Sequence, residues 1–421
     1  MDAQTLSIEQ LARAARRAAT AVATLTTERK NQTLLALAAR LAQRQDAILQ
    51  ANAQDLQLAE AAGLASAKLQ RLRLTASGLG QLCDGLRQVA ALPDPVGAVV
   101  KGWTAPSGML VSKVRTPLGV ICMIYEARPG VTVDAFALCF KSGNACILKG
   151  GKEAHHSNTL LAAIVRETLT EQGVPPEAMT AFTSSSRDEL RELLRQDASI
   201  DLVIPRGGHE LIRFVAEHSR IPTVQHYQGV CHIFVHERAD LEQSLRVCLT
   251  AKTSAPATCN AAECVLVDRA VAERFVPDLL RAYGQAGVEV RGDEQVARLG
   301  AGMAHVRPAG PEDFGREFLD LIVAMRVVDG LEGAIEHIGR YTSNHSEAIL
   351  TEDQATATAF TQRVQASCVL VNASTRMNDG FALGLGAEIG ISTTRVHAYG
   401  PMGLEELTTQ RYVVEGSGQT R

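Results

Sequence analysis

From residue 118 onward the chain alternates between short apolar runs and helical stretches, and this alternation constrains the fold more than any other feature. The first set predicts strands at 119–125, 145–149, 180–182, 201–204 and 231–235, with helices at 132–141, 156–172, 187–196 and 210–218. A second alternating set occupies 263–267, 270–283, 288–290, 319–328, 331–338, 348–350, 354–364 and 367–371. Strands separated by helices are typical of a parallel sheet with crossover helices. We therefore expect two α/β domains.

Before residue 118 the pattern of apolar residues is different. Residues 5–92 read as helix, because apolar residues recur at helical spacing and no proline occurs before Pro93. The segments 98–101 and 109–115 flank a turn-rich stretch at 105–108, which predicts an antiparallel hairpin. A protruding hairpin has edges that need partners, so we expect it to contribute to a homo-oligomer.

Composition excludes several classes of function. The chain has 421 residues, of which 46% are hydrophobic and 21% charged, as in an ordinary soluble globular protein. A net charge of −4 argues against a general surface for nucleic acid or anionic membrane. Neither a signal peptide nor an apolar run of membrane-spanning length is found, and the odd number of cysteines, without CxxC pairs, fits a reducing compartment. We expect a cytoplasmic protein, and the histidine spacing predicts no metal site.

Cys259 is the strongest candidate for covalent chemistry among the nine cysteines. It lies among small and polar residues, after a proline-containing loop and just before an apolar run. Such a cysteine can be partly exposed and can stand near a helix start, where backbone N–H groups stabilise a thiolate. Most of the other cysteines lie within apolar stretches, where a cysteine is usually a small buried hydrophobe. From the residues alone, that inert role remains open for Cys259 as well.

Two loops could bind an anion, although no GxGxxG follows a predicted strand. In the first, a strand runs into Gly207 and Gly208 at a helix start, where backbone N–H groups can meet a phosphate. In the second, Lys149 and Lys152 follow a strand, and strand carboxyl ends are where open α/β sheets bind ligands. Lys149 could hold a ribose hydroxyl and Lys152 a 2′-phosphate. An ordinary turn and a solvated loop remain the alternatives.

These features occur in an order that resembles a known family. The segments 119–129, 142–149, 205–208, 258–260 and 369–372 are similar to those of the aldehyde dehydrogenase superfamily. The segments 125–129, 149–153, 371–376, 384–393 and 400–408 resemble, more specifically, its gamma-glutamyl phosphate reductases. The resemblance covers essentially the whole chain, and it implies an aldehyde-dehydrogenase-like fold with two parallel-sheet α/β domains and a small oligomerisation arm.

The resemblance also implies a division of the chain. A helical N-terminus and a cofactor-binding α/β domain would occupy residues 1–245, with the protruding hairpin at about 96–116. A catalytic α/β domain that carries the nucleophile would occupy residues 246–375. Residues 376–421 would return to the cofactor domain and to the oligomerisation arm.

Roles for single residues follow from the same resemblance. Cys259 would be the nucleophile, Lys149 the lysine that binds the cofactor ribose, and Glu317 the second ribose-binding residue. The implied reaction reduces L-glutamyl 5-phosphate to L-glutamate 5-semialdehyde with NADPH, through a cysteine thioester, in proline biosynthesis. Arg128 could hold the substrate phosphate, although an exposed structural arginine is the alternative. Asn260 and Asn372 are further substrate-binding candidates, and glutamate 5-kinase could supply the substrate.

The chain departs from the superfamily pattern at several positions. The stretch matching the water-activating glutamate of hydrolytic members, 225–229, contains no carboxylate, and Ala127 replaces the oxyanion asparagine. The backbone N–H of Cys259 is then a candidate oxyanion donor. Unusual residues at 377–378, 381–383 and 399 could alter substrate contacts. An aldehyde dehydrogenase with another substrate, or a non-catalytic protein of the same fold, therefore stay open as alternatives.

Overall fold

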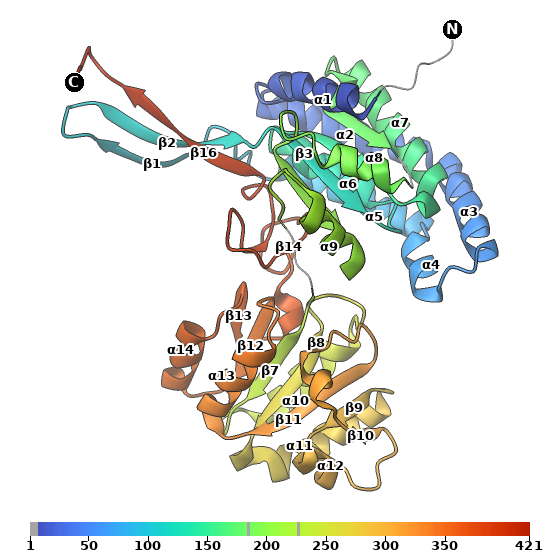
Figure 1. The fold of residues 1–421 in the computed structure, drawn as a ribbon, viewed down its shortest axis with the longest axis vertical. Coiled ribbons are helices and arrows are strands. Elements are labelled where there is room, and N and C mark those ends of the chain that lie inside the picture. The colour runs from blue at the N-terminus through green and yellow to red at the C-terminus, as the bar shows by residue number, and fades with distance from the viewer. Residues whose placement is uncertain (1–6, 183–185, 225–227) are drawn as a thin grey trace. The chain divides into compact units, whose positions relative to one another are not determined.

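The computed structural model describes residues 7–182, 186–224 and 228–421, and the chain forms two compact units (Figure 1). Unit 1 consists of Met1–Gln225, Gly384–Gly390 and Met402–Arg421. Unit 2 consists of His226–Leu383 and Ile391–Pro401. Within the described residues, no helix has the length and apolar character needed to cross a membrane.

Unit 1 begins with the helices predicted for residues 5–92. They are α1 (Ile8–Val22), α2 (Thr27–Gln43), α3 (Gln45–Ala61), α4 (Ser66–Leu72) and α5 (Ala76–Ala91). Ser7 forms a capping box with Gln10 at the start of α1, and the hydroxyls of Thr26 and Thr75 cap α2 and α5. These caps satisfy N–H groups that the first turn of a helix leaves without partners.

A four-stranded parallel sheet forms the centre of unit 1, in the order β5-β4-β3-β6. Its strands are β3 (Val120–Tyr125), β4 (Ala145–Lys149), β5 (Met179–Phe182) and β6 (Leu202–Arg206). Helices α6 (Val131–Lys141) and α7 (His155–Glu171) pack on these strands. The core on the other face includes side chains from α1, α8 (Arg187–Leu193) and α9 (His209–His218). All carboxyl ends of the strands therefore lie at one edge of the sheet.

The predicted hairpin is part of a three-stranded antiparallel arm of unit 1. Strands β1 (Val99–Thr104) and β2 (Leu110–Pro117) pair with each other, and β16 (Thr408–Glu415) adds on the far side of β2. The arm extends from the body of unit 1 (Figure 1). It exposes large apolar side chains on all three strands: Val99, Val100, Trp103, Leu110, Tyr412, Val413 and Val414.

Unit 2 contains a seven-stranded, wholly parallel sheet in the order β10-β9-β11-β8-β7-β12-β13. The strands are β7 (Cys231–Val235), β8 (Ala262–Asp268), β9 (Glu289–Gly292), β10 (Val306–Pro308), β11 (Ile322–Val328), β12 (Ser346–Leu350) and β13 (Cys368–Val371). The core on one face includes α10 (Leu241–Thr253), α11 (Arg269–Gln285) and α12 (Glu294–Leu299). The core on the other includes α13 (Gly330–Tyr341) and α14 (Gln354–Arg363).

The structure corrects the sequence interpretation at one boundary and adds elements. Strand β7 was predicted to belong with the first alternating set, and residues 1–245 were expected to form one domain. Instead β7 is fully buried between β8 and β12 in the sheet of unit 2, so the compact units divide after residue 225. Helices α10 and α12 and strands β10 and β16 were not predicted, and neither was the small ladder of β14 (Ile391–Ser392) with β15 (Gly400–Pro401).

Candidate active site

Cys259 lies in the turn that joins α10 to β8 in unit 2. Its side chain is half-buried, whereas seven of the other eight cysteines are buried and Cys368 is half-buried. Burial raises the pKa of Cys368, and it raises the pKa of Cys122 to about 12, so these thiols stay protonated. Strand β8, and not a helix, follows Cys259. The helix N-terminus that was expected to stabilise its thiolate therefore does not follow it in the chain. Cys259 is nevertheless one of only two cysteines in the chain that are not buried.

The backbone of Cys259 is held closely by the entry to β7. A Cβ atom at Gly229 would lie 2.0 Å from the carbonyl oxygen of Cys259, so only glycine fits there. The thiol of Cys231 donates to the same carbonyl oxygen at a sulfur–oxygen distance of 3.2 Å. Burial raises the pKa of Cys231 well above its ordinary value, which keeps the thiol protonated as a donor. The sequence analysis did not predict that Gly229 or Cys231 contacts Cys259. Residues 225–227 of the stretch that matches the water-activating segment of hydrolytic relatives lie outside the described residues.

A buried ion pair lies beneath the turn. Lys252 on α10 contacts Glu263 on β8 at 2.7 Å, and both side chains are fully buried. Burial raises the pKa of Glu263 and lowers the pKa of Lys252, while their mutual attraction opposes both shifts. The other carboxylate oxygen of Glu263 accepts the backbone N–H of Leu319 at 3.4 Å, and Leu319 has a φ of +55°. Glu263 is therefore fully engaged and fixes the segment that contains the half-buried Glu317.

Asn260 is buried and belongs to a network with Arg376. The guanidinium of Arg376 donates to side-chain oxygens of Thr258 and Asn260, the two neighbours of Cys259. The amide of Asn260 donates to the carbonyl oxygen of Asn378 at 3.0 Å. Arg376 belongs to one of the segments that carried the family resemblance, but its role was not predicted, because 116 residues separate it from Asn260 in the sequence.

Asn372 has a structural role besides the one expected for it. Its side-chain oxygen accepts the backbone N–H of Thr351, and its amide donates to the carbonyl oxygen of Thr351, both at 2.8 Å. Asn372 has a φ of +53°, which an asparagine tolerates better than most residues. The side chain thus braces the ends of β12 and β13, and the exposed Asn372 stays a proposed substrate ligand.

The predicted cofactor residues of unit 1 lie at the carboxyl edge of its sheet. Lys149 ends β4 and is half-buried, and Lys152 begins the short helix η1 (Lys152–Ala154) and is exposed. Burial lowers the pKa of Lys149, although Glu153, Glu126 and Glu189 act in the opposite direction. These carboxylates favour the charged form of Lys149 and so oppose the effect of burial on its pKa.

Gly207 and Gly208 lie between a strand and a helix start, as expected, but one of their backbone N–H groups already has an acceptor. Gly208 stands at the N-cap of α9, after β6. Its N–H donates to a carboxylate oxygen of Glu126 at 3.3 Å. A Cβ atom at Gly207 would lie 2.6 Å from Leu211 and 3.0 Å from Glu126, so the loop packs closely. The carboxylate of Glu126 thus accepts one of the N–H groups that a bound anion could use.

The remaining residues near this edge lie on the loop after β3. Arg128 is exposed, and the preceding Ala127 is buried with a φ of +44°. The backbone N–H of Ala127 donates to Glu153. The residue that replaces the superfamily's oxyanion asparagine therefore helps to anchor the loop, and its own N–H is already used.

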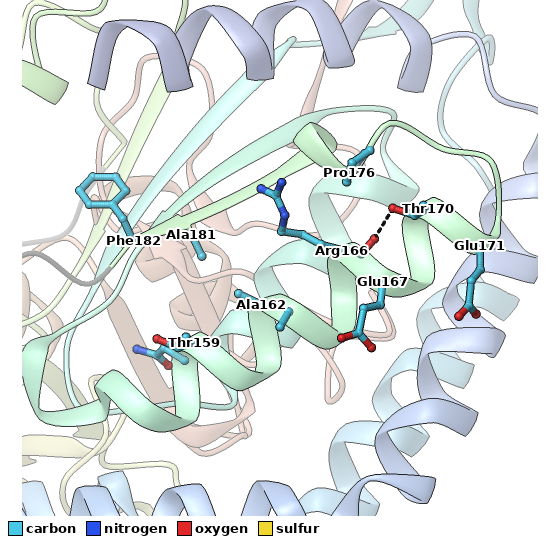
Figure 2. Close-up of a pocket in the computed structure, with 11 residues that line it drawn as sticks. Thr159, Ala162, Arg166, Glu167, Thr170, Glu171, Pro176, Ala181 and Phe182 are labelled. Carbon is cyan, nitrogen blue, oxygen red and sulfur yellow. Dashed lines mark hydrogen bonds between the residues drawn. The ribbon is translucent and has the colours of Figure 1, made fainter. Parts of the chain in front are cut away.

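A cavity of about 890 Å³ lies elsewhere in unit 1. It follows the outer side of α7 next to the edge strand β5, as Figure 2 shows. It is lined by residues of α7 from Asn158 to Glu171 together with Pro176, Ala181 and Phe182. None of the predicted site residues lines it. We therefore locate the chemistry by the nucleophile and the strand ends, and not by this cavity.

Three potential metal ligands meet in unit 2, although the sequence spacing predicted none. His232, Cys264 and His337 are buried, and their ligand atoms lie within 4.8 Å of one another. However, Arg326 donates to Nδ1 of His337 at 3.2 Å, so the neutral ring carries its proton on Nε2, which faces the Cys264 sulfur. A cationic guanidinium and an occupied nitrogen disfavour a metal ion. We interpret the cluster as a hydrogen-bonded part of the core.

The sequence and the fold of this chain are similar to those of known proteins. A model of the aldehyde dehydrogenase family matches residues 1–303. Gamma-glutamyl phosphate reductases of Geobacter metallireducens and Anaeromyxobacter sp. are 48% and 51% identical over 414 and 416 residues. Each alignment covers 98% of this chain, and they cover 98% and 97% of the two relatives.

Solved structures agree with this relationship. The crystal structure of gamma-glutamyl phosphate reductase from Thermotoga maritima has a TM-score of 0.95 at 40% identity, covering 99% of this chain and 100% of that one. An acetylating aldehyde dehydrogenase from Geobacillus thermoglucosidasius, at 16% identity and a TM-score of 0.70, shares the fold over 98% of this chain and 97% of its own. The aldehyde-dehydrogenase-like α/β fold expected from the sequence is thus confirmed. This chain belongs to the aldehyde dehydrogenase family and, within it, to the gamma-glutamyl phosphate reductases.

Proposed function

We propose that this enzyme reduces L-glutamyl 5-phosphate to L-glutamate 5-semialdehyde and phosphate, the second step of proline biosynthesis from glutamate. The observation that carries the proposal is identity of about 50% along almost the whole chain to proteins named gamma-glutamyl phosphate reductase. The half-buried, firmly held Cys259 supplies the nucleophile that such a reaction needs.

The reaction divides into two steps at Cys259. The thiolate attacks the acyl carbon of the substrate, the bond from that carbon to the phosphate oxygen breaks, and a thioester remains on the enzyme. NADPH, when bound, supplies the hydride for the second step. After hydride addition the bond between carbon and sulfur breaks, which releases the aldehyde and regenerates the thiolate. The carbonyl oxygen carries negative charge in both steps, and the backbone N–H of Cys259 is our candidate donor to it.

The thioester must survive until hydride transfer. In the sequence, residues 225–229 offer no carboxylate at the position where hydrolytic relatives carry a water-activating glutamate. Glu263 is not a substitute, because it is buried and engaged with Lys252 and Leu319. A carboxylate that activates water near the thioester would favour hydrolysis, so the lack of one in this stretch fits a reductase.

The residues at the sheet edge of unit 1 fit a nicotinamide dinucleotide. Lys149 is proposed to bind a ribose hydroxyl, Lys152 the 2′-phosphate of NADPH, and the loop of Gly207 and Gly208 the pyrophosphate. Glu317 is proposed to bind the second ribose. The exposed ammonium group of Lys152 supports a preference for NADPH over NADH, while Glu126 and Glu153 act against it.

Arg128 and Asn260 are proposed substrate ligands. The exposed guanidinium of Arg128 could meet the substrate phosphate, whereas Asn260 also serves to hold the turn of the nucleophile. Glutamate 5-kinase is the proposed source of the substrate, because it would deliver the labile acyl phosphate directly.

The enzyme is further proposed to be a cytoplasmic homo-oligomer. Nine free cysteines support a reducing compartment. The exposed apolar side chains of the arm, Trp103 and Tyr412 among them, support contact with a second copy of the chain.

The proposal is tested by offering the purified enzyme two classes of activated acyl substrate. Glutamyl phosphate, formed in situ by a kinase, should support NADPH oxidation, while acyl coenzyme A thioesters should support little. Faster oxidation with a coenzyme A thioester would contradict the proposal and identify an acylating aldehyde dehydrogenase.

A further inference from the structure

Arg376 donates hydrogen bonds to the side chains of the two residues that flank Cys259. It lies in the short helix η4 (Thr375–Met377), which follows β13. Its Nη1 donates to Oγ1 of Thr258 at 3.0 Å and also to Oδ1 of Asn260. Because these two residues are the immediate neighbours of Cys259, one guanidinium nitrogen fixes the chain on both sides of the sulfur.

The segment around Arg376 is itself tied to the sheet of unit 2. The amide of Asn260 donates back to the carbonyl oxygen of Asn378 at 3.0 Å. The amide of Asn378 donates to Oγ of Ser346, at the start of β12, at 2.8 Å. The guanidinium therefore cannot move away from Cys259 without breaking several hydrogen bonds.

Among the described residues, Arg376 uses only part of its hydrogen-bonding capacity. A guanidinium offers five N–H donors, and in the described part of the chain only Nη1 has partners. Nε is buried and has no partner there. A buried donor without an acceptor is unfavourable, so a ligand that supplied one would be stabilised. The Nε–Nη2 edge is the side of a guanidinium that binds a carboxylate or phosphate through two parallel hydrogen bonds.

We propose that Arg376 is an oxyanion-binding residue of the active site, and this inference rests on the proposed function. Through Nη1 it positions Cys259, and through Nε and Nη2 it takes oxygens of the acyl substrate. The ligand is a phosphate or a carboxylate group, because L-glutamyl 5-phosphate carries both.

The first experiment measures which substrate group depends on Arg376. NADP reduction with glutamate 5-semialdehyde is followed while phosphate and semialdehyde are varied separately, in the wild type and in Arg376→Gln. Loss of a charged, two-point contact should raise one Michaelis constant roughly 10- to 100-fold. A rise for phosphate identifies the phosphate as the ligand, and a rise for semialdehyde identifies the carboxylate. If both constants stay within about twofold of wild type, Arg376 only braces the turn and the proposal fails.

Two variants serve as controls. Arg363→Gln removes an arginine from the same unit that pairs with Glu332 on the surface, and it should leave both constants unchanged. Arg376→Lys keeps the positive charge but loses the two-point geometry, so it should give a smaller rise in the same constant. If Arg376→Gln does not fold, as judged by circular dichroism, the lysine variant replaces it in the comparison.

A second experiment needs no turnover, so it separates this inference from the proposed function. Alkylation of Cys259 by iodoacetamide is followed by mass spectrometry with added inorganic phosphate or glutarate. One of these anions should slow alkylation of the wild type, and it should have at least about tenfold less effect on Arg376→Gln. Equal protection of both proteins, or no protection of the wild type, would overturn the proposal. Protection without phosphate-dependent NADP reduction would instead contradict the proposed reaction alone.

Discussion

At the scale of single residues, Cys259 depends on partners that are distant in the sequence. Gly229 permits the close approach of β7, the thiol of Cys231 holds the carbonyl oxygen of Cys259, and Arg376 holds the two flanking side chains. These contacts fix the nucleophile with its side chain half-buried, whereas most other cysteines lie in apolar cores. The difference between a reactive and an inert cysteine is therefore one of surroundings.

Replacement of the nucleophile gives the simplest prediction. Cys259→Ala should lower turnover by about 10³-fold or more, because the covalent step requires sulfur, while NADPH should still bind. Steady-state kinetics and fluorescence titration of NADPH check the two parts. Near-normal rates in the alanine variant would remove Cys259 from the mechanism.

Cys264→Ala is the matched control for this prediction. Cys264 is fully buried in β8 and its sulfur lies 3.7 Å from Nε2 of His337. We expect the free energy of unfolding to fall by about 1–2 kcal/mol, with turnover nearly unchanged in the folded fraction. Urea unfolding and kinetics on the same preparation separate the two effects.

At the scale of elements, helix α13 packs a titratable residue against the sheet of unit 2. His337 is 4% exposed, and its ring contacts those of Phe314 and Tyr341. Burial, with smaller contributions from His232, Arg326 and Arg340, lowers its pKa from 6.5 to about 2. Between these values the unfolded chain binds a proton that the folded chain does not. His337 therefore reduces the stability of the fold as the pH falls below 6.5.

The free energy of unfolding should therefore depend on pH through His337, and a variant without this histidine isolates its contribution. Between pH 7.5 and pH 5.5 the wild type should lose about 1.4 kcal/mol of unfolding free energy relative to His337→Gln. Urea unfolding of both proteins at the two pH values measures the difference. If the gap between wild type and variant is the same at both pH values, His337 does not titrate as its burial implies.

Most helices and strands could be predicted from the sequence, but the pairing of the strands could not. Local patterns predicted the N-terminal helices, the hairpin and most strands, because hydrophobic periodicity and turn residues act over short distances. They did not show that β7 pairs with β8 and β12, or that β16 joins the hairpin, since strand pairing is decided by distant parts of the chain. The fold class could be predicted, but sheet membership could not.

The same limit applies to the site. Cys259 and Lys149 could be named from their local sequence, whereas Glu317 and the specific roles of all three came from the family resemblance. Arg376 stood within a recognised segment but had no role until the fold placed it against Thr258 and Asn260. The contacts of Asn372 with Thr351 were also not predicted, because they join residues that are distant in the sequence.

At the scale of the whole molecule, the chain crosses between its two units more than once. Residues Gly384–Gly390 and Met402–Arg421 belong to unit 1, although they follow the sheet of unit 2 in the sequence. The last of these residues form β16 in the arm. Cys259 and Glu317 lie in unit 2, and the proposed cofactor residues Lys149, Lys152 and the glycine pair lie in unit 1.

The central claim is that the thioester at Cys259 exchanges with phosphate and not with water. The most direct test is the reverse reaction, in which NADP reduction by glutamate 5-semialdehyde is followed while phosphate is titrated from zero. We predict a rate that saturates with phosphate, with an acyl phosphate as product, because the stretch 225–229 carries no carboxylate to activate water and the site must already hold the leaving phosphate. Sustained turnover at full rate without phosphate, yielding glutamate, would contradict the account and identify a hydrolytic aldehyde dehydrogenase.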